Sequence, residues 1–182
     1  MVEAAANRFG ALDILVNNAA HFALAPLLDA TGEDALRFFG PNLFGPLQCS
    51  RAFARKVIAS GRSGAIINVS SIASKRPAPG CGLYSATKAA VNALTRAWAV
   101  ELAGTGVRVN AVAPGPVETP IFGKTGMTDE QLQATIARLT ATVPIGRIGA
   151  PDEIATWVLH LADPSAAWVT GQIIGVDGGK SA

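Results

Sequence analysis

The stretch GAIINVSSIASKRPAPGCGLYSATK, residues 64–88, decides the fold because it joins a buried strand to a long helix through a polar turn. Residues 65–69 form a short apolar run with little polar alternation, which is typical of a strand buried on both faces. The apolar pattern of residues 84–103 predicts a long helix. A buried strand followed by a long helix is the repeating unit of a parallel sheet covered by helices.

The same alternation of strands and helices extends in both directions from this stretch. Short apolar runs predict further strands at residues 12–17, 107–112 and 172–176. Helical patterns cover residues 2–9, 31–60, 129–140 and 151–162. Glycines and prolines predict a loop over residues 113–126. The alternation therefore predicts one α/β domain over residues 1–182, with a Rossmann-like, doubly wound parallel sheet.

Composition and charge limit the class of protein. The chain is 49% hydrophobic and only 15% charged, which favours a well-buried globule over a disordered chain. A formal charge of +2 without interleaved basic and aromatic residues argues against a nucleic-acid partner. The charged N-terminal segment and the strand-sized apolar runs predict neither a signal peptide nor a membrane span. Two cysteines without ligand spacing indicate reduced thiols in the cytoplasm and no metal site.

Small and polar residues follow three of the predicted strands. Residues 17–20 follow the first strand, Ser70 and Ser71 follow the second, and residues 114–119 follow the third. Right-handed crossovers bring the carboxyl ends of parallel strands to one edge of the sheet. We therefore expect the three segments to converge on one crevice.

Tyr84 is the only tyrosine of the chain, and Lys88 follows it four residues later, so both side chains lie on one helix face. The ammonium of Lys88 favours the phenolate and is expected to lower the pKa of Tyr84 from its usual value of about 10. Ser71 can hold a substrate oxygen against the tyrosine hydroxyl, and the amide of Asn42 is expected to hold a water that connects Lys88 to solvent. This set predicts a proton-transfer site for carbonyl and alcohol chemistry.

Six segments occur in an order and at spacings that resemble those of the short-chain dehydrogenase/reductase family: LDILVNNAA, GPNLFGP, IINVSSIAS, YSATK, VRVNAVAPGPVETP and VTGQIIGVDGG. The resemblance covers essentially all of residues 1–182. It implies an oxidoreductase that transfers a hydride between NAD or NADP and a carbonyl or secondary alcohol of a small molecule. It also implies a homodimer or homotetramer. The segment that chooses between NAD and NADP in the family has no counterpart here, so the cofactor preference stays open.

The resemblance also assigns residues to roles. It makes Asn42, Ser71, Tyr84 and Lys88 the catalytic set. It assigns contacts with the cofactor to Asn17, Ala19, Tyr84, Lys88, Pro114, Gly115, Val117 and Thr119. Within that set, Lys88 is expected to hydrogen-bond the nicotinamide ribose, while Val117 and Thr119 are expected to contact the carboxamide.

Three features depart from the family pattern. Ala20 stands where glycine is usual, and Pro41 precedes Asn42 in a predicted helix, which predicts a kink there. No glycine-rich turn for a dinucleotide pyrophosphate precedes the first strand, so the chain resembles the second half of the fold, truncated at its N-terminal side. Two interpretations follow: Met1 is an internal start of a longer active enzyme, or the chain is a non-catalytic, oligomerising fragment that binds cofactor weakly or not at all.

Overall fold

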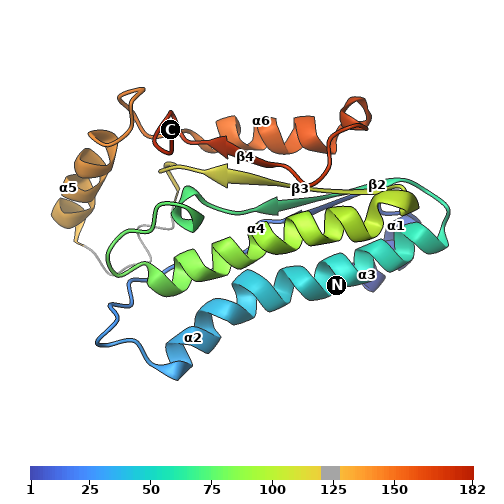
Figure 1. Ribbon diagram of the computed structural model, residues 1–182, viewed down its shortest axis with the longest axis horizontal. Helices are drawn as coiled ribbons and strands as arrows, with labels where there is room; N and C mark the ends of the chain where they lie inside the picture. Colours follow the sequence, from blue (N-terminus) through green and yellow to red (C-terminus); the bar gives the residue numbers. More distant parts are fainter. Residues whose placement is uncertain (120–127) are drawn as a thin grey trace.

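Four parallel strands form the middle layer of the part of the protein that the computed structural model describes, residues 1–119 and 128–182 (Figure 1). The strands are β1 (Ile14–Asn17), β2 (Gly64–Val69), β3 (Val107–Pro114) and β4 (Ile173–Val176), hydrogen-bonded in that order. Every neighbouring pair is parallel. The predicted α/β class with a Rossmann-like sheet is therefore confirmed.

Helices cover both faces of this sheet. Helices α3 (Gly45–Ala59) and α4 (Gly82–Leu102) pack on one face, and α6 (Pro151–Ala162) packs on the other (Figure 1). Helix α1 (Val2–Phe9) lies against α3, and α2 (Gly32–Phe39) contacts α4. Helix α5 (Asp129–Thr140) lies beyond the carboxyl ends of the strands, at the left of Figure 1. The layers leave the carboxyl edge of the sheet as the place where loops from several strands meet.

The predicted helix over residues 31–60 is interrupted in the structure. A capping box of Thr31 and Asp34 opens α2, but α2 ends at Phe39 and a π-helical turn, η1 (Gly40–Phe44), follows. Pro41 lacks an N–H group for a regular helical bond, and the amide of Gly45 instead reaches the carbonyl of Gly40. The predicted irregularity at Pro41 is confirmed, and it places Asn42 inside the turn.

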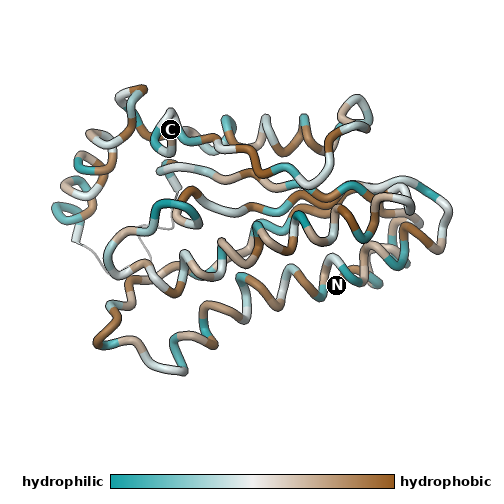
Figure 2. Tube along the Cα trace, viewed as in Figure 1, coloured by the Kyte–Doolittle hydropathy of each residue, from teal (hydrophilic) through white to brown (hydrophobic). Residues whose placement is uncertain are grey.

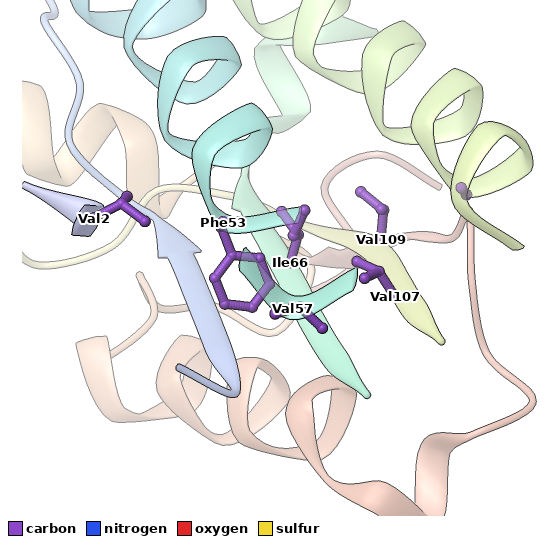
Figure 3. Packing of buried hydrophobic residues seen from close by; sticks show 7 residues of the cluster. Val2, Phe53, Val57, Ile66, Val107 and Val109 are labelled. Atoms are coloured by element: carbon purple, nitrogen blue, oxygen red, sulfur yellow. The ribbon is translucent and has the colours of Figure 1, made fainter. Parts of the chain in front are cut away.

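Two apolar cores lie on opposite faces of the sheet because neighbouring strand residues point to opposite sides. Toward α3 and α4, Phe53 and Val57 pack on Ile66 of β2, with Val107 and Val109 of β3 beside them (Figure 3). The second core, toward α6, contains Ala65, Ile67, Val112, Leu161 and Ala162. In Figure 2, brown apolar segments lie along the central strands of the sheet. Burying a side chain such as Phe53 stabilises the fold by about 1.5–3 kcal/mol.

Strand β1 is an edge of this sheet and pairs only with β2 among the described strands. Two of its apolar side chains are partly open to solvent: Ile14 is 50% exposed and Val16 is 41% exposed. This edge of the described sheet is therefore partly apolar. None of the described helices is long and apolar enough to cross a membrane.

Candidate active site

The carboxyl ends of the strands open into a cavity of about 740 Å³. The segments that follow β1, β2 and β3 all contribute to its walls, together with α4, α5 and α6. The walls include Phe22, Ser71, Tyr84, Lys88, Val117 and Thr119. The predicted convergence of three strand ends on one crevice is thus what the structure shows.

Lys88 projects from α4 into a nearly closed environment. Its residue is only 3% exposed, and its Nζ donates a hydrogen bond to the carbonyl oxygen of Val69 at 2.7 Å. The hydroxyl of Ser70 donates to the carbonyl of Lys88 at 3.2 Å, which joins the end of β2 to α4. Burial of the ammonium lowers the pKa of Lys88 to about 8. Lys88 therefore exchanges its proton much closer to neutral pH than a solvated lysine does.

Tyr84 lies one helical turn before Lys88, and its ring packs edge-on against the ring of Phe22 with centroids 5.0 Å apart. Burial raises the pKa of the Tyr84 phenol, a hydrogen bond with Ser71 opposes this, and the nearby Cys81 raises it further. The direction is opposite to the lowering by Lys88 that the sequence predicts. The ammonium lies over the face of the tyrosine ring, 5.8 Å from its centroid, and is hydrogen-bonded to Val69. The loss of phenol hydration therefore dominates.

Ser71 begins the short 3-10 turn η2 (Ile72–Ser74) in an extended conformation. Its Oγ accepts a hydrogen bond from the backbone N–H of Ala73 at 3.1 Å. Since the backbone occupies the oxygen as an acceptor, the hydroxyl proton remains available to donate. The hydrogen bond that lowers the pKa of Tyr84 shows that the two hydroxyls share one side of the cavity.

Asn42, in the π-helical turn η1, is 1% exposed. Its Oδ1 accepts from the backbone N–H of His21 at 2.6 Å, and its Nδ2 donates to the carbonyl of His21 at 3.0 Å and to Oγ1 of Thr87 at 3.0 Å. Both amide hydrogens are thus engaged by the protein, so the side chain does not offer them to the water that the sequence predicts. Instead, Asn42 ties the segment after β1 to α4, one residue away from Lys88.

The segment after β1 divides its residues between structure and cavity. Asn17 donates to Oγ of Ser50 at 3.0 Å and to Oδ1 of Asn68 at 2.8 Å, so its side chain braces α3 and β2. Asn18 and Ala20 line the cavity, whereas the predicted contact residues Asn17 and Ala19 are not part of its walls. No described residue other than glycine has a positive φ angle, so the methyl group of Ala20 is accommodated without backbone strain.

The four residues predicted at and after the end of β3 all line the cavity: Pro114, Gly115, Val117 and Thr119. A Cβ at Gly115 would lie 2.8 Å from both Cα and Cβ of Asp177, so only glycine allows this close approach to the end of β4. Val117 forms an isolated parallel bridge with Gly149. Residues 120–127 of the predicted loop lie outside the described residues.

Sequence reasoning missed two residues that shape the site. Phe22 supplies the aromatic wall beside Tyr84, and Thr87 connects Asn42 to the backbone of Tyr84 by donating to its carbonyl at 2.7 Å. Threonines inside helices often bond back to the preceding turn, so the presence of Thr87 in the helix gives little indication in the sequence that it belongs to the site. Phe22 follows the first strand end by five residues and carries no local pattern.

Comparisons with known proteins agree with this geometry. The family model described as enoyl-(acyl carrier protein) reductase matches residues 1–181. The chain is 39% identical over 179 residues to the 3-oxoacyl-acyl-carrier-protein reductase FabG of Thermotoga maritima, covering 98% of this chain and 70% of that protein. It is 40% identical over 179 residues to the sorbitol dehydrogenase of Cereibacter sphaeroides, covering 96% of this chain and 70% of that protein.

Solved structures show the same similarity. The structure of a gluconate 5-dehydrogenase from Burkholderia cenocepacia, in complex with NADP and tartrate, matches with a TM-score of 0.90 at 35% sequence identity. The match covers 99% of this chain and 69% of that chain. Sequence and backbone thus agree over nearly all of residues 1–182.

Proposed function

Because the chain belongs to the short-chain dehydrogenase/reductase family of oxidoreductases, we propose that it transfers a hydride between NAD or NADP and a carbonyl or secondary alcohol of a small molecule, with Tyr84 as acid and base. The observation that carries this proposal is the single cavity in which Tyr84, Ser71 and Lys88 meet. Asn42 belongs to the same set as a positioning residue, since its hydrogen bonds run to His21 and Thr87.

The hydrogen-bonding groups of the cavity fit a nicotinamide nucleotide. Lys88 Nζ carries three N–H donors, and Val69 is its one acceptor among the described residues, which leaves two donors for hydroxyl groups such as those of a ribose. Val117 and Thr119 line the same cavity and would hold the carboxamide, and Pro114 and Gly115 line it as well. We propose that Ala19 lies beside the adenosine part of the cofactor. Asn17 would support this contact indirectly, because its side chain holds the end of β1 against Asn68 of β2.

The protein side chains account for the proton. When bound, the cofactor supplies the hydride acceptor for alcohol oxidation and the hydride donor for carbonyl reduction. Ser71 donates a hydrogen bond to the substrate oxygen, keeping its own proton, and holds that oxygen against Tyr84. Tyr84 takes the alcohol proton during oxidation and returns it during reduction. Burial raises the pKa of Tyr84, so the neutral phenol is favoured, which suits the reduction direction near neutral pH.

The proposal extends to the state of the protein. Residues 1–182 act as one domain, in the cytoplasm, as a homodimer or homotetramer, without a nucleic-acid or membrane partner. Support for association comes from apolar side chains open to solvent: Val100 of α4 is 81% exposed and Trp168 is 100% exposed. Sedimentation equilibrium on the purified chain measures this state directly.

The decisive experiment titrates the purified protein with NADH and NADPH, follows tryptophan quenching, and then measures turnover of a panel of small ketones and secondary alcohols. Tyr84→Phe should bind the nucleotide as the wild type does and lose at least about 100-fold in kcat. Ser71→Ala should lose activity similarly. Ser85→Ala is the matched control, because its hydroxyl lies on α4 beside Tyr84, has no hydrogen-bond partner in the described residues and does not line the cavity.

Two outcomes would overturn the proposal. Turnover that survives in Tyr84→Phe would remove Tyr84 from the chemistry. Absence of saturable binding of either nucleotide would instead support the non-catalytic alternative, in which the chain associates without using a cofactor.

A further inference from the structure

The described walls of the cavity carry positive charge without negative charge. Arg76, Lys88 and Lys180 line the cavity, and no described aspartate or glutamate does. The chain as a whole is nearly balanced, with 15 basic and 13 acidic residues, so this is a local concentration of one sign. Lys88 belongs to the proposed proton chemistry, which leaves Arg76 and Lys180 without a role in it.

Arg76 follows the catalytic Ser71 by five residues, on the loop between η2 and α4. Its Nη2 donates to a terminal carboxyl oxygen of Ala182, the last residue of the sequence, at 2.7 Å, and no described aspartate or glutamate pairs with it. A guanidinium has five N–H donors in a planar fork that matches a carboxylate. Most of these donors are therefore available to a ligand in the cavity.

Lys180 reaches the same cavity from the segment after β4. Its Nζ donates to the hydroxyl of Thr142 at 2.5 Å, which is a neutral partner. Burial and the nearby positive charge of Arg138 both lower the pKa of Lys180. Arg76, Lys88 and Lys180 are therefore three cationic side chains in the walls of one cavity, and a negatively charged group bound there would relieve their mutual repulsion.

The chain path explains why two distant residues meet. Residues 179–182 turn back toward the loop that leaves Ser71, and the hydrogen bond from Arg76 to Ala182 joins the two segments. The segment expected to hold the nicotinamide, residues 114–119, enters the cavity from β3 instead. Arg76 and Lys180 thus line the same cavity as Ser71, from two segments that meet at Ala182.

We propose that Arg76 and Lys180 bind a carboxylate of the substrate, so that this protein acts on hydroxy acids and oxo acids in preference to neutral alcohols and ketones. The proposal deepens the proposed function and rests on it. The carboxylate is held by the guanidinium fork and the ammonium, while the reacting carbonyl or hydroxyl of the same molecule reaches Ser71 and Tyr84. Arg76 and Lys180 then recognise the acid, while Ser71 and Tyr84, in the same cavity, serve the hydride transfer.

The test compares each acid with its uncharged ester. The full chain is assayed with acetoacetate and 4-oxopentanoate, each beside its methyl ester, and kcat/KM is measured for wild type, Arg76→Met, Lys180→Met and Lys75→Met. The wild type should prefer the acid, and Arg76→Met and Lys180→Met should each lower the acid-to-ester ratio by about tenfold. Lys75→Met is the matched control: it removes a neighbouring positive charge that does not line the cavity, and its ratio should equal that of the wild type.

Calorimetric titration with the same acids and esters separates this inference from the proposed function. Turnover of both compounds that depends on Tyr84 but shows no acid preference would overturn the inference and leave the proposed function intact. If Arg76 serves only to hold Ala182, Arg76→Met will lower turnover of acid and ester equally, which also overturns it. If no turnover depends on Tyr84, the proposed function fails, and calorimetry decides the inference: tighter binding of the acid that is lost in Arg76→Met supports it, and equal or absent binding overturns it.

Discussion

Replacing Lys88 with methionine should remove a penalty that the wild type carries below pH 8. Lys88 is 3% exposed, and burial lowers its pKa from the ordinary value of 10.5 to about 8. The unfolded chain therefore binds more protons than the native protein between these two pH values. The unfolding free energy of the wild type must rise with pH through that window, because stability increases wherever the unfolded state holds more protons.

The magnitude follows from the same two values. At about 1.4 kcal/mol per pKa unit, the difference corresponds to about 3 kcal/mol, fully present as a penalty at pH 7 and relieved near pH 10.5. The variant also loses the hydrogen bond from Lys88 to Val69, which is worth about 1.5–3 kcal/mol for a charged donor. At pH 7 the two effects nearly offset, so Lys88→Met should be about as stable as wild type, although inactive.

Urea unfolding followed by tryptophan fluorescence at several pH values from 7 to 10.5 measures the effect, at fixed protein concentration because association shifts stability. The stability of Lys88→Met relative to wild type should fall by about 3 kcal/mol over this range. Tyr84 is present in both proteins, so its own titration largely cancels in the difference. Lys75→Met controls for replacing an exposed lysine. A difference between Lys88→Met and wild type that stays constant with pH would refute the buried-ammonium argument.

Two further substitutions test the frame of the site. Asn42→Ala removes three hydrogen bonds to His21 and Thr87 and should lower the unfolding free energy by about 3 kcal/mol, measured by urea unfolding; an unchanged midpoint would contradict this. Gly115→Ala places a methyl group 2.8 Å from the backbone of Asp177, so the segment after β3 must shift; affinity for NADH should fall about tenfold, and unchanged affinity would show that this segment does not hold the cofactor.

The layered fold could be predicted because parallel strands that are buried on both faces appear in the sequence as short apolar runs. The strand predicted at residues 65–69 is Gly64–Val69, and the one at 172–176 is Ile173–Val176. The interruption at Gly40–Phe44 could not be placed in the same way. The apolar periodicity continues across Pro41, so the sequence does not show where the helix changes. Whether the helix kinks, ends or contains a π-helical turn depends on the carbonyl to which the amide of Gly45 donates, and in the structure this is the carbonyl of Gly40.

The candidate site was predictable only as far as local spacing and the parallel-sheet rule extend. Four-residue spacing places Tyr84 and Lys88 on one helix face, and the rule brings Ser71 and residues 114–119 to the same edge. The pKa direction of Tyr84 was predicted wrongly, because the sequence shows the nearby lysine but not how completely the phenol is buried. The hydrogen bonds of Asn42 to residues 21 and 87 depend on tertiary packing, and no spacing rule anticipates them.

The cations of the cavity differ in burial, and this difference separates their roles. Lys88 is almost completely buried, so salt screens its charge weakly, and that charge changes the stability of the folded state itself. Arg76 is exposed, so salt at 0.1 M screens its charge over a distance of about 10 Å. An exposed guanidinium can select a charged ligand without destabilising the fold. Added salt should therefore weaken recognition of an acid while leaving turnover of its ester unchanged. If added salt did not weaken acid recognition more than it weakens ester turnover, an exposed cation would not be the group that selects the acid, and Arg76 would be only an anchor for residue 182.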